Sequence, residues 1–342
     1  MTLVNFYSDT QTRPSRAMLE TALTAEVGDE QGGLDPTTNS LCERVAELLG
    51  QEAAVFLPSG TMCNEIALAV HTRPGDEVIC ERTCHIINFE GGGPAAISGL
   101  MTSPINGEHG QFTADQVRGA IRAPGRYAPI SKVVAVEQTA NHGGGSVWSV
   151  TQMAEVVEAT HAVGLIAHMD GARLMNAAVA AGLPAHAFAS QFDSVWVDFT
   201  KGLGCGVGAA LAGSRDFIEQ AWRYKQMWGG AMRQSGILAA MANYALDHNV
   251  DRLAEDHALA AALATKIADL PGVAKVIEPQ TNILLFDLAP DRPTAQDLAE
   301  TLLKEDVRVS VFGPRRIRVV THMDVGQADA DVLIGALTRR LG

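Results

Sequence analysis

The chain has 342 residues, of which 47% are hydrophobic and 19% charged, and its formal net charge is −13. This length allows two domains with a sizeable core, whereas the negative charge argues against non-specific binding to nucleic acids or anionic membranes. The start of the chain has no basic segment followed by an apolar one, and no apolar run could span a bilayer, so we expect neither a secretory signal nor a membrane anchor.

The first third of the chain begins with a polar arm, residues 1–15. A helix is predicted over residues 15–25, with Ser15 as its N-cap. A loop rich in Gly and Asp covers residues 27–39, and an amphipathic helix over residues 40–49 stops at a glycine.

A phosphate-binding turn is indicated next. Residues 53–57 form a short apolar strand, and Ser59, Gly60 and Thr61 lead from it into an apolar helix over residues 62–72. Backbone N–H groups and hydroxyls at a helix N-terminus can hold a phosphate. Ser and Thr also cap many helices for purely structural reasons, and this alternative stays open.

Further strands are predicted over residues 77–80, 133–137, 164–169 and 195–199. They alternate with helices, as expected for a largely parallel sheet covered on both faces. Polar and glycine residues cluster just after these strands, where open α/β sheets bind ligands. His85 follows one of them and could stack on a flat cofactor, although a lone histidine is more often structural.

Lys201 and Asp170 point to pyridoxal phosphate. Each follows a strand, and Lys201 lies between an apolar strand and a run of glycines, a setting that lowers the pKa of an amine. A lysine of this kind links covalently to the cofactor aldehyde, and a carboxylate keeps the pyridine nitrogen protonated. Alone, Asp170 could cap a turn and Lys201 could be a surface charge.

The composition changes in the last quarter of the chain. Residues 222–230 are interpreted as a loop, and helices are predicted over residues 236–246 and 250–270. An α+β pattern follows, with strands over residues 282–288, 307–312 and 317–321 and helices over residues 294–305 and 328–341. We therefore predict a large domain over residues 16–249 and a small one over residues 250–342. Arg318 lies in an apolar strand, so it either binds a carboxylate or is a solvated edge residue.

The five cysteines have no disulfide or zinc-site spacing, so we expect reduced thiols and a cytoplasmic protein. We see no basis for a metal requirement.

Seven motifs together identify a family. In chain order they are SDTQTRPSRAML, VGDE, LPSGTMCN, MDGARLMNA, TKGLGCGVGAALAGSRDFI, GGAMRQSGILAA and RVVTHMDV. They span nearly the whole chain and resemble the low-specificity L-threonine aldolases, within the superfamily of β-eliminating lyases and threonine aldolases. This resemblance implies a pyridoxal phosphate enzyme of fold type I, like aspartate aminotransferase, with a mostly parallel seven-stranded sheet between helices.

The resemblance also implies roles for individual residues. Lys201, Asp170 and His85 would bind and activate the cofactor, with Ser59, Gly60 and Thr61 at its phosphate. Ser8, Arg173 and Arg318 would bind the substrate carboxylate, and Arg233 would assist at the phosphate across a subunit interface. It further implies a homotetramer built from dimers that share active sites.

Three positions depart from the family pattern at the substrate end. Gly32 replaces an aromatic residue, Ala140 replaces a histidine, and Tyr127 aligns with another histidine. His142 or Tyr127 is therefore a candidate base. We expect retro-aldol cleavage of an L-β-hydroxy-α-amino acid, such as threonine, allo-threonine or phenylserine. The alternatives are another pyridoxal phosphate enzyme (a β-eliminating lyase, racemase or aminotransferase) and a catalytically silent binding protein.

Overall fold

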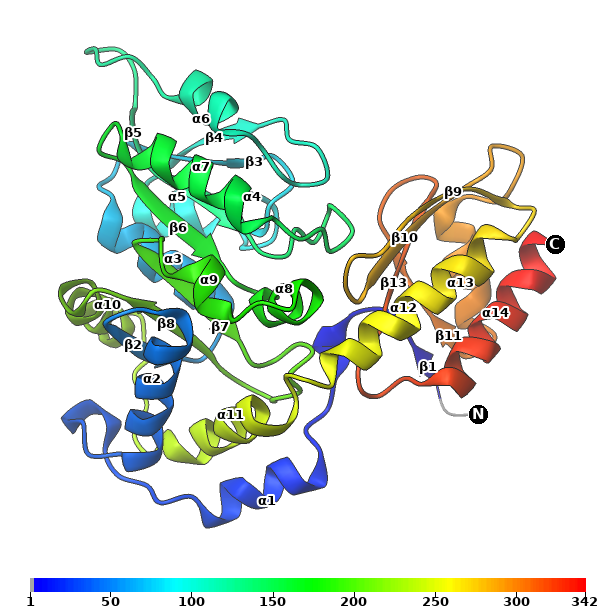
Figure 1. Cartoon of the computed structure of the whole chain (residues 1–342), viewed down its shortest axis with the longest axis horizontal. Coiled ribbons are helices and arrows are strands. Elements are labelled where there is room, and N and C mark those ends of the chain that lie inside the picture. Colours follow the sequence, from blue (N-terminus) through cyan, green and yellow to red (C-terminus); the bar gives the residue numbers. More distant parts are fainter. Residues whose placement is uncertain (1–2) are drawn as a thin grey trace.

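The large lobe is built on one seven-stranded sheet. The computed structural model describes residues 3–342, and Figure 1 shows two lobes of unequal size. The strand order is β2-β8-β7-β6-β5-β3-β4, and only β8 is antiparallel to its neighbours. The strands are β2 (Ala53–Leu57), β3 (Asp76–Glu81), β4 (Met101–Ile105), β5 (Ile130–Glu137), β6 (Ile166–Asp170), β7 (Ser194–Asp198) and β8 (Ala209–Gly213). The prediction of a mostly parallel seven-stranded α/β sheet is confirmed.

Helices cover both faces of this sheet (Figure 1). They are α1 (Arg16–Thr24), α2 (Pro36–Leu49), α3 (Gly60–His71), α4 (His85–Asn88), α5 (Gly93–Ser98), α6 (Ala114–Ala120), α7 (Val150–His161), α8 (Leu174–Ala181), α9 (Ala185–Ala189), α10 (Arg215–Met227) and α11 (Gly236–His248). Strand β7 shows how the faces divide. Val195 and Val197 join the core cluster that includes residues of α2, α7 and α8, whereas Trp196 packs with residues of α3 and α10. Every residue of β7 is buried because both faces are covered.

Side-chain caps fix where several helices begin. Ser15 accepts a hydrogen bond from the backbone N–H of Met18 at the start of α1, as predicted. Ser59 does the same for α3. Helix α2 starts at Pro36, earlier than predicted, because Asp35 caps it.

The small lobe contains a four-stranded antiparallel sheet of order β12-β13-β10-β9. Its elements are α12 (Leu253–Ala268), β9 (Val273–Ile277), β10 (Ile283–Leu288), α13 (Ala295–Leu303), β12 (Ser310–Val311), β13 (Arg316–Val320) and α14 (Gln327–Leu341). The single strand expected over residues 307–312 is in fact two. β11 (Val307–Arg308) pairs with β1 (Val4–Asn5) of the N-terminal arm, and β12 pairs with β13.

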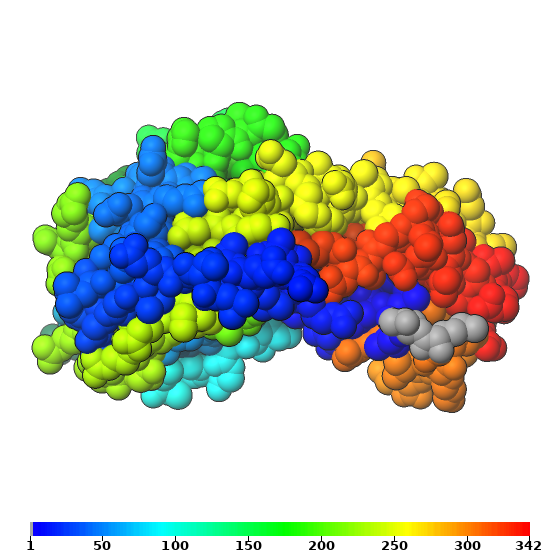
Figure 2. Space-filling view, turned by 90° about the horizontal axis from the view of Figure 1, so that it is seen from below, coloured from blue at the N-terminus to red at the C-terminus, as the bar shows by residue number. Residues whose placement is uncertain are grey.

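The N-terminal arm thus belongs structurally to the small lobe before the chain crosses to the large one. Figure 2 shows the blue N-terminal segment lying along one face of the molecule, from the large lobe to the C-terminal part. Helix α1 packs against α11 on the way. The arm therefore connects the lobes at a second place, besides the direct connection from α11 to α12.

The prediction of a loop over residues 222–230 is wrong. Residues up to Met227 belong to α10, whose N-cap is Ser214. The mixture of aromatic and charged residues obscured an amphipathic helix, in which Lys225 is fully buried and its Nζ lies 2.8 Å from Glu30 Oε1. Among residues 3–342, the longest apolar helices still fall short of what a bilayer span requires.

Candidate active site

Lys201 lies directly after β7, at the carboxyl ends of the parallel strands. Its side chain is only 18% exposed, and Nζ forms an ion pair with Asp198, the last residue of β7. Nζ also lies 5.8 Å from the centre of the Trp196 ring. The expected mostly apolar setting of Lys201 is therefore wrong, because a carboxylate lies beside its amine.

Asp170 ends the neighbouring strand β6 and is 1% exposed. One carboxylate oxygen accepts a bond from the backbone N–H of Ala172 (3.0 Å), and the other accepts one from Asn64 Nδ2 (2.9 Å). The carbonyl oxygen of Asn64 in turn accepts from Trp196 Nε1 (2.7 Å) and bonds to His168 Nε2 (3.0 Å). Asn64 is thus held from several sides, and it holds Asp170 in one orientation.

His85 begins α4 next to this carboxylate. One ring nitrogen of His85 and one carboxylate oxygen each of Glu90 and Asp170 all lie within 4.8 Å of one another. His85 Nδ1 bonds to Glu90 Oε1 at 2.9 Å. Burial lowers the pKa of His85, but the Glu90 hydrogen bond and the charges of Asp170, Glu90 and Glu137 outweigh burial and raise it.

Glu137, the last residue of β5, links the segment of His85 to the segment of Asn141. Its carboxylate accepts the backbone N–H of His85 (2.7 Å) and that of Asn141 (2.8 Å). Burial, followed by the charge of Asp170, raises the pKa of Glu137 to about 7. One side chain therefore positions both the His85 segment and the Asn141 segment.

The turn Ser59-Gly60-Thr61 starts α3, a helix of 12 residues. Ser59 Oγ accepts the Met62 N–H at 3.2 Å, so it acts as an N-cap. Gly60 is required by packing, since a Cβ atom there would lie 2.2 Å from the Trp196 ring. The same tryptophan thus contacts this turn and holds Asn64, which connects the predicted phosphate site to the Asp170 site.

Arg173 is occupied by another residue of the chain. It is 5% exposed and donates two bonds to Asp9, from Nε at 2.8 Å and from Nη2 at 2.6 Å. Asp9 also accepts a bond from Asn282 Nδ2 at 3.0 Å, and it is fully buried. Arg173 was expected to bind the substrate carboxylate. Asp9 would compete with that carboxylate, because it already accepts two bonds from the guanidinium of Arg173.

Arg318 of β13 has one N–H donor, on Nε, that is not used within the described chain. Its Nη1 donates to Asn141 Oδ1 at 2.7 Å and its Nη2 to the backbone oxygen of Tyr7 at 3.0 Å, while Nε is buried and has no partner among residues 3–342. Burial, and then the charge of Arg173, lower the pKa of Arg318 to about 10, so it remains charged at neutral pH. Ser8, adjacent to Tyr7, is buried and caps the short helix Asp9–Gln11.

His142 lies in a stack of rings that joins the two lobes. Its ring is 5.2 Å from that of Phe89, after α4, and 4.4 Å from that of Phe312, in the small lobe. The stack continues on one side to His85, 5.7 Å from Phe89, and on the other to the Arg318 guanidinium, 4.2 Å from Phe312. His142 Nε2 is buried without a partner among the described residues. Burial, followed by the charge of Arg318, lowers its pKa, so the ring is neutral at neutral pH.

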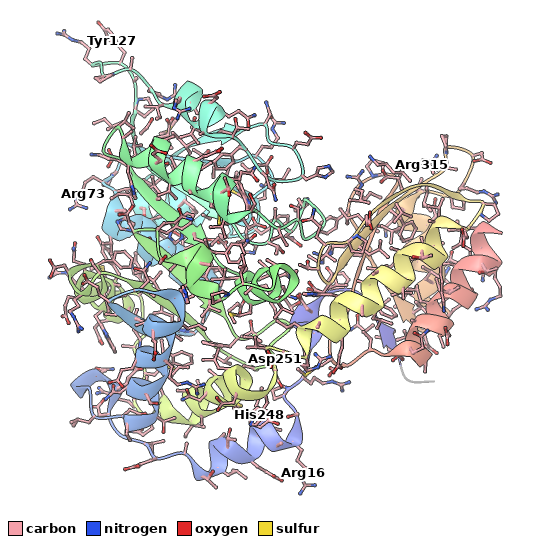
Figure 3. All side chains as sticks on the ribbon, viewed as in Figure 1. Arg16, Arg73, Tyr127, His248, Asp251 and Arg315 are labelled. Atoms are coloured by element: carbon pink, nitrogen blue, oxygen red, sulfur yellow. The ribbon has the colours of Figure 1, made fainter. Side chains whose placement is uncertain are left out.

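Two predicted residues are not brought to this site within one chain. Tyr127 is 95% exposed and lies at the tip of a projecting loop, far from the lobe junction (Figure 3). Arg233 is exposed and pairs with Asp29 at 3.2 Å. Gly32 ends a short 3₁₀ turn and is exposed, whereas Ala140 is buried in the segment that leads to His142.

Sequence reasoning missed the residues that orient the predicted ones. They are Asp9, Asn64, Phe89, Glu90, Glu137, Asn141, Asp198, Asn282 and Phe312. Position offered a signal only for Glu137 and Asp198, since each carboxylate ends a strand of the sheet, as Asp170 does. The others come from helices and loops whose proximity depends on the fold.

The donor set fits pyridoxal phosphate. A lysine and a buried carboxylate lie at adjacent strand ends, and a partly exposed imidazole lies next to the carboxylate. A capped helix N-terminus lies against Trp196, whose ring is near the lysine and bonds to Asn64, the partner of the carboxylate. These groups match an aldehyde, a pyridine nitrogen, a flat ring and a phosphate, respectively.

Comparisons with known proteins agree with this geometry. The profile of the β-eliminating lyase family matches residues 5–290. Low-specificity L-threonine aldolase 1 of Arabidopsis thaliana is 38% identical over 335 residues, covering 96% of this chain and 94% of that protein. The low specificity L-threonine aldolase of Escherichia coli K12 is 39% identical over 326 residues, with 95% of each chain covered.

A solved structure shows the same fold at lower identity. The threonine aldolase of Leishmania major superposes with a TM-score of 0.84 at 21% identity, over 99% of each chain. By the extent of the family match and its similarity to the two aldolases, this chain belongs to the β-eliminating lyase family and groups within it with the low-specificity L-threonine aldolases.

Proposed function

We propose that this protein cleaves an L-β-hydroxy-α-amino acid of the threonine, allo-threonine or phenylserine type to glycine and an aldehyde, with pyridoxal phosphate as cofactor. The observation that supports this most directly is the placement of Lys201 and Asp170 at the ends of the adjacent strands β7 and β6, in a chain 38% and 39% identical to two such aldolases. When bound, pyridoxal phosphate supplies a conjugated ring that takes up the electron pair of the breaking Cα–Cβ bond.

The residues around the ring have separate tasks in this proposal. Lys201 Nζ binds the cofactor covalently, and Asp170 holds a proton at the pyridine nitrogen. His85 covers one face of the ring. The turn Ser59-Gly60-Thr61 binds the phosphate through N–H groups of α3 that have no partner within the helix.

The substrate end uses the residues at the lobe junction. Arg318 donates from Nε to the substrate carboxylate, and Ser8 lies beside it on the arm. Arg173 supports this positive region while remaining paired with Asp9. Holding the carboxylate would fix the orientation of the substrate's Cα, which is a positioning effect.

His142 is the base in this proposal. A neutral imidazole with a buried, unpaired Nε2 can accept the proton of the β-hydroxyl group. The rings of Phe89 and Phe312 stack on His142 from either side and hold its ring in place. Tyr127 is the second candidate base, and its exposure requires that it act in another copy of the chain.

We further propose a cytoplasmic homotetramer built from dimers, in which Arg233 reaches the phosphate of a neighbouring site. Its exposure, with only an exposed aspartate as partner, leaves it available for such a contact. Sedimentation of the purified protein tests the assembly, and a monomeric particle with full activity contradicts it.

A product assay tests the proposed reaction. Protein loaded with pyridoxal phosphate is incubated with L-threonine, L-allo-threonine, L-phenylserine and their D-isomers, and glycine, aldehyde and pyruvate are measured. Glycine with the matching aldehyde from L-isomers is expected, and Lys201→Ala should lower the rate more than about 10³-fold, equivalent to about 4 kcal/mol. Pyruvate without glycine would instead assign β-elimination.

A further inference from the structure

Two buried glutamates, Glu65 of α3 and Glu90 after α4, are in contact behind His85. Glu65 is 3% exposed and Glu90 is 8% exposed, and their carboxyl groups are close enough to hydrogen-bond. Glu90 Oε1 accepts bonds from His85 Nδ1 (2.9 Å) and Asn64 Nδ2 (2.6 Å). Glu90 Oε2 and both oxygens of Glu65 have no donor among residues 3–342.

This arrangement requires a proton. Two ionised carboxylates in contact repel each other, and burial removes the water that would solvate them. A single proton on Glu65, donated to Glu90, removes one charge and gives a partner to an oxygen on each side. Burial, followed by the charge of Glu90, raises the pKa of Glu65 to about 8, in agreement with a protonated group at neutral pH.

Packing fixes the Glu65 carboxyl group in place. Gly93, at the start of α5, leaves the space that Glu65 fills, since a Cβ atom there would lie 1.9 Å from Glu65 Oε1. The carboxyl group therefore cannot turn toward α5 to avoid Glu90.

Charged groups from several neighbouring elements surround the pair. Those closest to Glu90 are His85 of α4 and Asp170 of β6, which shares the Asn64 Nδ2 donor with Glu90. Glu137 of β5 acts on His85. Asp198 at the end of β7 and its partner Lys201 act, like Glu90, on Cys63, the neighbour of Asn64 in sequence. A second negative charge on the glutamate pair would act on His85 directly and on Asp170 through Asn64.

We infer that Glu65 is a positioning residue. Its protonated carboxyl group donates a hydrogen bond to Glu90, so that Glu90 accepts the bonds of His85 and Asn64 while the pair carries a single negative charge. Its consequence for catalysis rests on the proposed placement of the cofactor against His85 and Asp170. Deprotonation of Glu65 at alkaline pH turns the pair into a doubly charged group, which draws positive charge onto His85 and disturbs the cofactor site.

Infrared spectroscopy of the cofactor-free protein tests the shared proton without any activity. A buried protonated carboxyl group gives its own C=O band. Because Glu137 also has a raised pKa, the spectrum of Glu65→Gln is subtracted from that of the wild type. We expect a band in this difference at pH 7 that disappears as the pH passes about 8. No band in the difference spectrum at pH 7 would overturn the inference.

Glu77→Gln is a matched control. Glu77 is equally buried, but it pairs with Arg122 at 2.7 Å, at the start of β3. We expect no protonated-carboxyl band in the wild-type minus Glu77→Gln difference, and such a band would show that the signal does not report the Glu65–Glu90 pair.

A pH titration of the absorbance of the cofactor-loaded protein tests the positioning role. The amide of Glu65→Gln can still donate to Glu90, so this variant should match the wild type at pH 7 and lose the alkaline transition. Glu65→Leu has neither a titrating carboxyl group nor a donor for Glu90, so it should also lose the alkaline transition and should differ from the wild type already at pH 7. Wild-type titration curves for both variants would refute the role. A protein that binds the cofactor and shows the infrared band but cleaves no amino acid would contradict only the proposed function.

Discussion

Asp9→Asn should destabilise the protein strongly, because Asp9 is where the arm, the large lobe and the small lobe meet. The buried carboxylate accepts two bonds from Arg173 and one from Asn282 of the small lobe. Asparagine keeps the shape but replaces one acceptor oxygen with an NH₂ group and removes the charge. Arg173, which is 5% exposed, then remains as a buried cation without its counter-ion.

Removing one partner of a buried ion pair costs about 3–5 kcal/mol, since the remaining charge is neither paired nor hydrated. For a chain of this size, that cost corresponds to a fall in Tm of roughly 10 °C. The matched control is Asp247→Asn. Asp247 pairs with Arg44 at a comparable distance of 2.6 Å, but both side chains are more than a third exposed. Such a pair contributes about 0–1 kcal/mol.

Thermal and urea unfolding of the cofactor-free variants at pH 7 provide the measurement. Equal losses for Asp9→Asn and Asp247→Asn would refute the reasoning. The double variant Asp9→Asn with Arg173→Gln should recover part of the loss, because no buried charge is then left unpaired.

The pH dependence follows from the same contact. Burial opposes ionisation of Asp9, but Arg173 outweighs it and holds the pKa of Asp9 below its ordinary value of 3.8. The stabilisation is therefore fully present above pH 3.8 and is lost as the pH falls through the folded-state pKa. The difference between wild type and Asp9→Asn should shrink in that acid range and stay constant from about pH 5 to neutral.

Three other substitutions and one control test the site. His142→Phe preserves the stack between Phe89 and Phe312 but removes Nε2, so kcat should fall about 10²–10⁴-fold at nearly constant Tm. An unchanged kcat would exclude His142 as the base. Tyr127→Phe should leave kcat within about twofold if His142 is the base, and a large loss would assign the base to Tyr127 of another copy. Gly60→Ala places a Cβ atom 2.2 Å from the Trp196 ring and should weaken cofactor binding about tenfold or more in an absorbance titration. Gly119→Ala, with nothing within 4 Å of the added atom, should bind normally.

Local sequence determined the elements and the position of the chemistry along them. Alternating apolar runs and helical periodicity predicted the central strands, and Ser15 and Ser59 cap helices where the pattern indicated. Strand ends in a parallel sheet meet at one edge, so Lys201 and Asp170 could be expected together from sequence alone. Those two residues pointed to pyridoxal phosphate, and the family motifs added the class of reaction.

Helix α10 and the divided strand at residues 307–312 show where local patterns were insufficient. In α10 the polar residues that led to the prediction of a loop include Lys225. This lysine is buried because the fold brings Glu30, from near the start of the chain, into contact with it. Strand β11 exists as a separate element because the N-terminal arm pairs with it. Both depend on partners about 200 or more residues away along the chain.

The tertiary structure alone decided the state of the functional groups. Lys201 proved to be ion-paired with Asp198, and Arg173 proved to be occupied by Asp9. The structure also aligned Phe89, His142, Phe312 and Arg318 in one stack across both lobes. Charge, desolvation and ring stacking act over a few ångströms, so these properties depend on which distant segments come into contact, and sequence periodicity has no information about that.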